Sequence, residues 1–184
     1  MPDDDPDDAG RRGSAVEIPG LGPVTFDARY NEYQSMQMPV PVLGNTRYRL
    51  VVSGYDDDKA KADFHAAISA FLALGESVRK AAAVPVFEYY EDMKEAVGED
   101  DVGVSIAGPG DVWPHVRHDD EVAIARDTDG DGQVYVWVTG ECAWEPEHGL
   151  QIVFRGGRSV TRVSPCDGHL TNLASQDVNY ERTS

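Results

Sequence analysis

The 184-residue sequence has only two cysteines, Cys142 and Cys166, and only four lysines among its 16 basic residues. No apolar run approaches the length that spans a bilayer, and no N-terminal stretch combines a basic region, an apolar region and a cleavage site. We therefore expect a cytoplasmic protein without a membrane partner. In that compartment both thiols are expected to stay reduced.

Positive charge is also scarce, because 33 Asp and Glu residues face 16 Lys and Arg residues and leave a net charge of −17. Nucleic acid is excluded as a direct partner, since binding it depends on neutralising phosphates with basic side chains. Anionic membrane surfaces are disfavoured for the same reason. A basic protein or a cation would be attracted instead. The other interpretation is that the charge only keeps the protein soluble.

The remaining composition is that of a folded chain, with 41% apolar and 27% charged residues. This length fits one domain with a proper core. The first 14 residues combine Pro, Gly and a run of Asp, and the last residues are similarly polar. Neither end can bury enough apolar surface to offset the conformational entropy lost on ordering. We predict a disordered acidic tail over residues 1–14, a single domain over 15–175 and a flexible tail over 176–184.

Hydrophobic periodicity predicts strands at both ends of the domain and two helices between them. The predicted strands are Val16–Ile18, Val24–Phe26, Arg47–Val52, Glu121–Arg126, Val134–Ala143, Leu150–Phe154 and Ser159–Val163. Met38–Leu43 contains two prolines, which predict an edge strand or an extended linker. This order predicts an α+β fold, in which an antiparallel sheet carries the two central helices packed on one face.

Helix boundaries are predicted from capping residues and proline. The aspartates at 56–58 supply oxygens for an N-cap, and the following apolar stripe extends to about Ala83. Pro85 suits the first turn of a helix, so a second helix is predicted to begin there and to end at Gly98.

Several segments resemble a bacterial family of domains of unknown function, and the similarity extends from about Val16 to Ala174. The most specific segment is the Trp-x-x-Glu-His-Gly-Leu motif. The segments are residues 18–22 (IPGLG), 87–90 (FEYY), 142–150 (CAWEPEHGL), 154–158 (FRGGR) and 167–169 (DGH). Members of such families resemble immunity proteins of bacterial toxin systems. The resemblance implies no catalytic residues.

The sharpest metal motif has aspartates at alternate positions, Asp127, Asp129 and Asp131, with Gly132 in the sixth place. This pattern matches the first half of a calcium-binding loop. The twelfth position should be a bidentate Glu but is Val138, and the flanking segments are strand-like. The alternative interpretation is an Asp- and Gly-rich β-hairpin turn.

A second possible metal site consists of zinc-type ligands, Cys142, His148, Cys166 and His169. The alternative is that the cysteines are buried apolar residues and the histidines belong to turns. Glu147 and His148 form a possible acid–base pair, but the sequence has no nucleophile-elbow pattern or other enzyme signature. An enzyme is therefore the less favoured class.

The segment Val134–Val138 is apolar on both faces, with Tyr135 and Trp137 opposite the valines. Such a strand is covered on both sides. It is either a central strand under helices and loops or part of an aromatic protein interface.

Two functions remain as hypotheses. The first is an acidic protein-binding domain that holds a basic partner, in its concrete form an immunity-type inhibitor that acts by occlusion. The alternative is a metal-dependent enzyme or calcium-binding domain, with a site near Glu147, His148 and the loop from Asp127 to Asp131.

Overall fold

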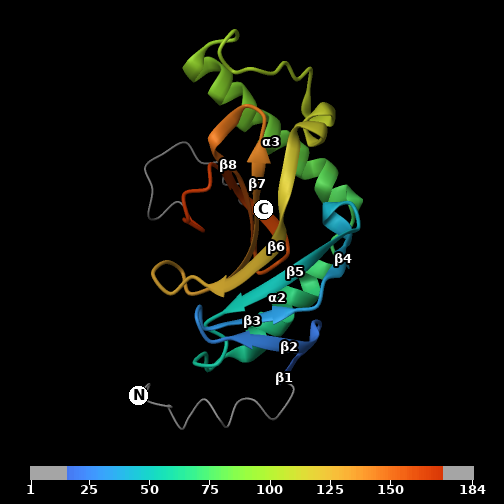
Figure 1. The fold of residues 1–184 in the computed structure, drawn as a ribbon, viewed down its shortest axis with the longest axis vertical. Coiled ribbons are helices and arrows are strands. Elements are labelled where there is room, and N and C mark those ends of the chain that lie inside the picture. Colours follow the sequence, from blue (N-terminus) through green and yellow to red (C-terminus); the bar gives the residue numbers. More distant parts are fainter. Residues whose placement is uncertain (1–15, 172–184) are drawn as a thin grey trace, which may run out of the picture.

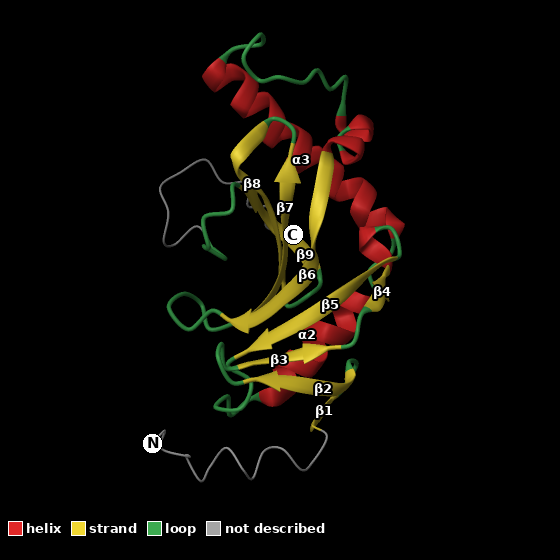
Figure 2. Cartoon of the chain, viewed as in Figure 1, coloured by secondary structure: helices red, strands yellow, loops and turns green. Residues whose placement is uncertain are grey.

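The computed structural model describes residues 16–171 (Figure 1), so the tails predicted at 1–14 and 176–184 lie outside the described residues. The described chain consists of strands and helices in the order strands, two helices, strands (Figure 2). The strands are β1 (Val16–Ile18), β2 (Gly22–Asp27), β3 (Glu32–Ser35), β4 (Met38–Val40), β5 (Thr46–Ser53), β6 (Val116–Arg126), β7 (Val134–Cys142), β8 (Glu145–Arg155) and β9 (Ser159–Ser164). The helices are α2 (Lys61–Leu72) and α3 (Glu76–Val97), with short 3-10 turns at Pro41–Leu43, Pro109–Asp111 and Trp113–His115.

The strands form one nine-stranded sheet in the order β1-β2-β3-β5-β6-β7-β8-β9, and β4 pairs with β5 beside this path. The α+β class is therefore confirmed. The predicted antiparallel arrangement is wrong at one junction, because β5 and β6 are parallel, with Leu50 opposite Val122. Both helices lie in the chain between these strands, and such a crossover is the connection that parallel pairing requires.

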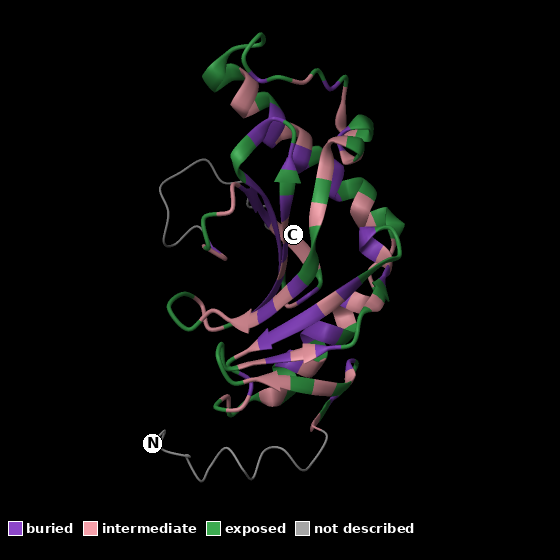
Figure 3. Cartoon of the chain, in the orientation of Figure 1, coloured by how far each residue is buried: buried purple, intermediate pink, exposed green. Residues whose placement is uncertain are grey.

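Alternation along the central strands places one set of side chains in the core. Leu50, Val52, Val122, Ile124 and Val136 all belong to the hydrophobic cluster, which also includes Phe64, Phe71 and Val86 of the helices. Figure 3 shows the buried residues (purple) gathered along these central strands. The intervening residues of the same strands point to the opposite face of the sheet.

The two helices contact different parts of the sheet. α2 contacts β6 and β7, and Phe71 packs its ring 5.1 Å from that of Phe154. α3 contacts β9, and its Tyr89 donates a hydrogen bond of 3.1 Å to the carbonyl of Gly149. Both helices therefore contact strands of the C-terminal half and share one hydrophobic cluster with them.

The predicted helix boundaries are wrong in two places. The break between the helices falls at residues 73–75, and Pro85 lies inside α3. Ala82, Val86, Tyr89 and Tyr90 continue one buried stripe through the proline, so tertiary packing outweighs the lost hydrogen bond. The residue before α2 is Ala60, which has no side-chain oxygen for a cap, and Asp58 accepts the Ala60 amide at 2.7 Å.

Candidate functional site

An irregularity in β6 brings three acidic residues together. His118 pairs with Gly140 and Val122 pairs with Val138 of β7, so that the three intervening residues of β6 face Thr139 alone. These three residues are Asp119, Asp120 and Glu121, and all are exposed. A bulge redirects side chains and bends its strand. Here it projects successive carboxylates from the same short segment.

Beside this bulge lies a groove of about 560 Å³ on the sheet face opposite the core. Its apolar floor is formed by Val51, Ala123 and Trp137, which alternate with core residues along β5, β6 and β7. The volume lies in the range of small-molecule pockets. The lining residues are Glu32, Gln37, Arg49, Val51, Asp119, Asp120, Glu121, Ala123, Trp137 and Thr139.

The groove carries four carboxylates and one guanidinium group. Glu121 forms an ion pair of 3.1 Å with Arg49, and Asp119 accepts a hydrogen bond from the Thr139 hydroxyl group. Glu32 accepts a hydrogen bond of 2.8 Å from Ser53. The Asp120 side chain has no hydrogen-bond or ion-pair partner within residues 16–171. The groove therefore retains a net negative charge.

Two glycines permit the backbone to pack closely behind the bulge. A Cβ atom at Gly140 would lie 2.5 Å from the carbonyl oxygen of Arg117 and 2.7 Å from the Cα of His118. Gly149 has a φ of +67°, and a Cβ there would lie 2.4 Å from the carbonyl oxygen of Gly140. All three distances are far below ordinary contact, so the bulge depends on these glycines.

His118 lies at one end of the bulge, and its ring centroid is 6.2 Å from that of Trp113. Burial, followed by the positive charge of Arg79, lowers the pKa of His118 to about 4, although Asp119 opposes the shift. The native protein therefore keeps this imidazole neutral at neutral pH.

The lowered pKa of His118 predicts a loss of stability in mild acid. The pKa of His118 is lower in the folded state than its unfolded value of about 6.5. The contribution of His118 to the free energy of unfolding is therefore intact above about pH 6.5 and is lost as the pH falls toward 4. Between about pH 7 and about pH 5 the free energy of unfolding should fall by about 2 kcal/mol from this residue. Urea unfolding at both pH values measures the loss. His118→Gln should remove it, whereas the control His115→Gln should retain it, and equal slopes in both variants would contradict the prediction.

The predicted calcium loop connects β6 to β7 as a hairpin turn. Asp127 accepts a hydrogen bond of 3.1 Å from the Gly130 amide, and Asp131 accepts one of 2.9 Å from the Gln133 amide. Asp131 also forms an ion pair of 2.5 Å with Arg155. Calcium binding through Asp127, Asp129 and Asp131 stays a prediction, and it would have to compete with these bonds. Calorimetric titration with millimolar calcium tests it, and a trace without heat would contradict it.

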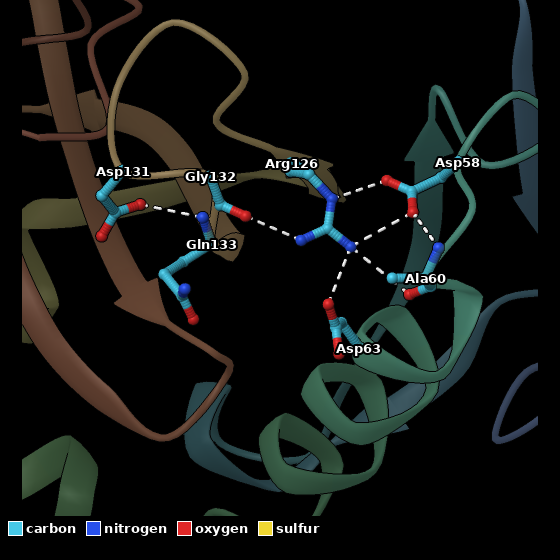
Figure 4. A network of polar contacts seen from close by, with 7 residues as sticks. All are labelled: Asp58, Ala60, Asp63, Arg126, Asp131, Gly132 and Gln133. Atoms are coloured by element: carbon cyan, nitrogen blue, oxygen red, sulfur yellow. Dashed lines mark hydrogen bonds and ion pairs between the residues drawn. The ribbon is translucent and has the colours of Figure 1, made fainter.

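Arg126 anchors the base of this loop to the start of α2 (Figure 4). Its guanidinium donates to Asp58 at 2.6 Å, to Asp63 at 2.9 Å and to the carbonyl of Gly132 at 2.7 Å. The Arg126 hydrogen bond is the main reason why the pKa of Asp58 is lowered. Asp58 thus binds the half-buried Arg126 in addition to accepting the Ala60 amide at 2.7 Å.

No three of the predicted zinc ligands Cys142, His148, Cys166 and His169 bring their ligand atoms together in the described part of the chain. The Cys142 thiol donates to the carbonyl of Glu145 at 3.5 Å and the Cys166 thiol to the carbonyl of Leu150 at 3.2 Å. Burial raises the pKa of Cys142 to about 12 and also raises that of Cys166. The backbone carbonyl of His169 accepts a hydrogen bond of 2.7 Å from Gln151.

One group of potential metal ligands does converge in the described part of the chain. Ligand atoms of Glu145, Glu147 and His148 lie within 4.8 Å of one another. The buried Glu145 carboxylate already accepts the His148 amide at 2.6 Å and hydrogen-bonds the imidazole Nδ1 at 3.3 Å. The predicted Glu147–His148 pair therefore gains a third residue that sequence reasoning did not name.

Sequence reasoning also missed the acidic groove, although it named parts of it. The segment that contains Trp137 was assigned either to a central strand or to an aromatic interface. The structure places β7 between β6 and β8 and leaves Trp137 only half-buried on the groove floor. The available signal was the acidic triplet that directly precedes an alternating apolar strand.

The fold and the groove together define an α+β domain whose mixed sheet carries an acidic groove opposite its core. The chain belongs to a family of domains of unknown function, DUF6985, whose model matches residues 20–170. No curated protein and no solved structure matches the chain. The expected domain of unknown function is thus confirmed, while the family motif, bacterial origin and similarity to immunity proteins stay predictions. No helix within residues 16–171 has the length and apolarity needed to cross a membrane.

Proposed function

We propose that this protein binds a basic segment of a partner protein in the acidic groove and acts by covering it, as an immunity-type inhibitor does. The observation that carries the proposal is the bulge in β6, which projects Asp119, Asp120 and Glu121 beside a half-buried tryptophan. Carboxylates and an aromatic ring are the two groups that hold Lys and Arg side chains.

The charge of the whole chain supports the same proposal. A net charge of −17 attracts a basic partner over a distance set by the ionic strength. The groove then supplies the local contacts, because its four carboxylates outnumber its single arginine. Electrostatic complementarity of this kind raises the association rate and selects the partner.

The alternative proposal is a metal-dependent function at Glu145, Glu147 and His148, whose potential ligand atoms converge. The Glu145 carboxylate is already engaged by His148, and Glu147 and His148 are exposed. The acidic groove is therefore the better supported site. Elemental analysis of the purified protein tests the alternative, and stoichiometric zinc that Glu145→Gln abolishes would favour it.

The binding proposal is tested by comparing the proteins captured by three forms of the chain. We expect the wild type to retain one stoichiometric partner at about 50 mM salt and to lose most of it at about 200 mM salt, because screening weakens exposed charge pairs. The double variant Asp120→Asn with Trp137→Ala should capture none of it. The control Asp100→Asn removes one carboxylate from a loop outside the groove and should bind as the wild type does. Capture that is insensitive to both salt and the groove variant would overturn the proposal.

A further inference from the structure

The groove already contains a guanidinium group that belongs to the chain itself. Arg49 is the one basic residue among those lining the groove, and it lies directly opposite Glu121 across the parallel β5–β6 pair. Its Nη1 lies 3.1 Å from the Glu121 Oε1. The two side chains are 42% and 51% exposed. A single contact between such exposed groups is weak and readily exchanged.

Two other groups in the groove, Asp120 and Trp137, are available to bind a second guanidinium group. Asp120 has no side-chain hydrogen bond or ion pair in the described part of the chain, and Trp137 has no cation over its ring there. Five other aromatic rings of the described chain do carry a basic side chain. They are Tyr30, Tyr55, Phe64, Tyr90 and Trp113, which pair with Arg29, Lys61, Arg126, Lys94 and Arg79 respectively.

Arginine fits this arrangement better than lysine. A guanidinium group is planar, binds a carboxylate with two parallel hydrogen bonds and stacks on an aromatic face. The ammonium group of lysine is a compact, strongly hydrated charge without the fork that matches a carboxylate. A residue that engages Glu121 and Asp120 beside Trp137 is therefore recognised most fully when it is arginine.

We infer that Arg49 is a built-in competitor of the partner, and that an arginine side chain of the partner displaces it from Glu121. This inference rests on the proposed function and adds two points to it. The recognised residue of the partner is an arginine, and Arg49 limits the affinity of the groove for that arginine. A partner guanidinium group that binds Glu121 with two parallel hydrogen bonds needs the Oε1 atom that Arg49 already contacts, and the two positive groups repel each other at close range. Breaking the Arg49–Glu121 pair thus lowers the affinity of the wild type for its partner by the modest free energy of one exposed ion pair.

The test uses capped hexa-arginine and hexalysine peptides as probes, with calorimetric titration at low salt. Arg49→Met should bind hexa-arginine about fivefold more tightly than the control Lys80→Met, because the ion pair no longer has to be broken. Lys80 lies on α3, contributes nothing to the groove and also forms an exposed ion pair, so the control removes the same charge. Wild-type protein should bind hexa-arginine more tightly than hexalysine.

The outcomes separate the inference from the proposed function. If Arg49→Met binds hexa-arginine no more tightly than Lys80→Met while Asp120→Asn weakens binding, the competitor role is overturned and the groove function stands. Equal affinity for the two peptides would overturn the preference for arginine. If Asp120→Asn and Trp137→Ala both bind hexa-arginine as the wild type does, the groove function fails and the inference fails with it.

Discussion

Gly140→Ala should lower the free energy of unfolding by about 3 kcal/mol, because the new methyl group has no space. The Cβ would lie 2.5 Å and 2.7 Å from backbone atoms of Arg117 and His118. Backbone atoms within a sheet cannot rotate away as the end of a flexible side chain can, so the strands must separate or shift. Urea unfolding of the wild type and the variant measures the loss.

The matched control is Gly110→Ala, where a Cβ would meet nothing within 4 Å. Its stability should stay within about 0.5 kcal/mol of the wild type. Because Gly140 faces the bulge, Gly140→Ala should also weaken binding in the groove under conditions where the variant is still folded. Equal stability of the two variants would show that the backbone approach behind the bulge is not a tight one.

Local sequence patterns suffice for most strands of the sheet. Glu121–Arg126, Leu150–Phe154 and Ser159–Val163 were predicted from apolar alternation and lie within β6, β8 and β9. β3 (Glu32–Ser35) was missed, although Tyr33 and Ser35 alternate with less buried residues. Its single aromatic among polar residues gives too weak a periodic signal, and pairing with β2 and β5 determines its structure.

The direction of strand pairing was not predictable in the same way. Each strand's own pattern indicates which face is buried, but it contains no information on which neighbour runs parallel. The β5–β6 pairing joins Arg49 to Glu121, 72 positions apart in the sequence. The helix break was missed for a related reason, since a local rule placed it at Pro85 while packing kept α3 continuous.

The groove was unpredictable because it is produced by register. Glu32, Arg49, Asp120 and Trp137 come from four strands, and their proximity depends on how these strands pair. Across the bulge, β6 contains two more residues than β7. This excess determines where the carboxylates point. An acidic triplet before a strand is visible in the sequence, but the offset that turns it toward Trp137 is a property of the assembled sheet.

Arg162→Met should cost about 3 kcal/mol of stability, because it removes a charge-assisted network from the interior. Arg162 on β9 is fully buried and donates to Asp167 at 2.8 Å and to the carbonyl of His169. Gln151 binds the same carbonyl. These bonds hold residues 167–169 against β8 and β9, so hydrogen exchange in this segment should increase together with the global loss.

The ion pair also predicts a pH dependence with a definite sign. Burial alone would raise the pKa of Asp167, but hydrogen bonds from Arg162 and the His169 amide outweigh it and lower the pKa. The contribution of Asp167 is therefore present above its unfolded pKa of about 3.9 and is lost as the pH falls through the folded value. Asp167→Asn should remove this acid-dependent contribution to the free energy of unfolding.

The matched control for Arg162→Met is Arg158→Met, which changes an exposed arginine on the neighbouring turn and should stay within about 0.5 kcal/mol of the wild type. If Arg162→Met were as stable as this control, the buried network would contribute no net stability, because the cost of desolvating Arg162 would offset its bonds to Asp167 and His169.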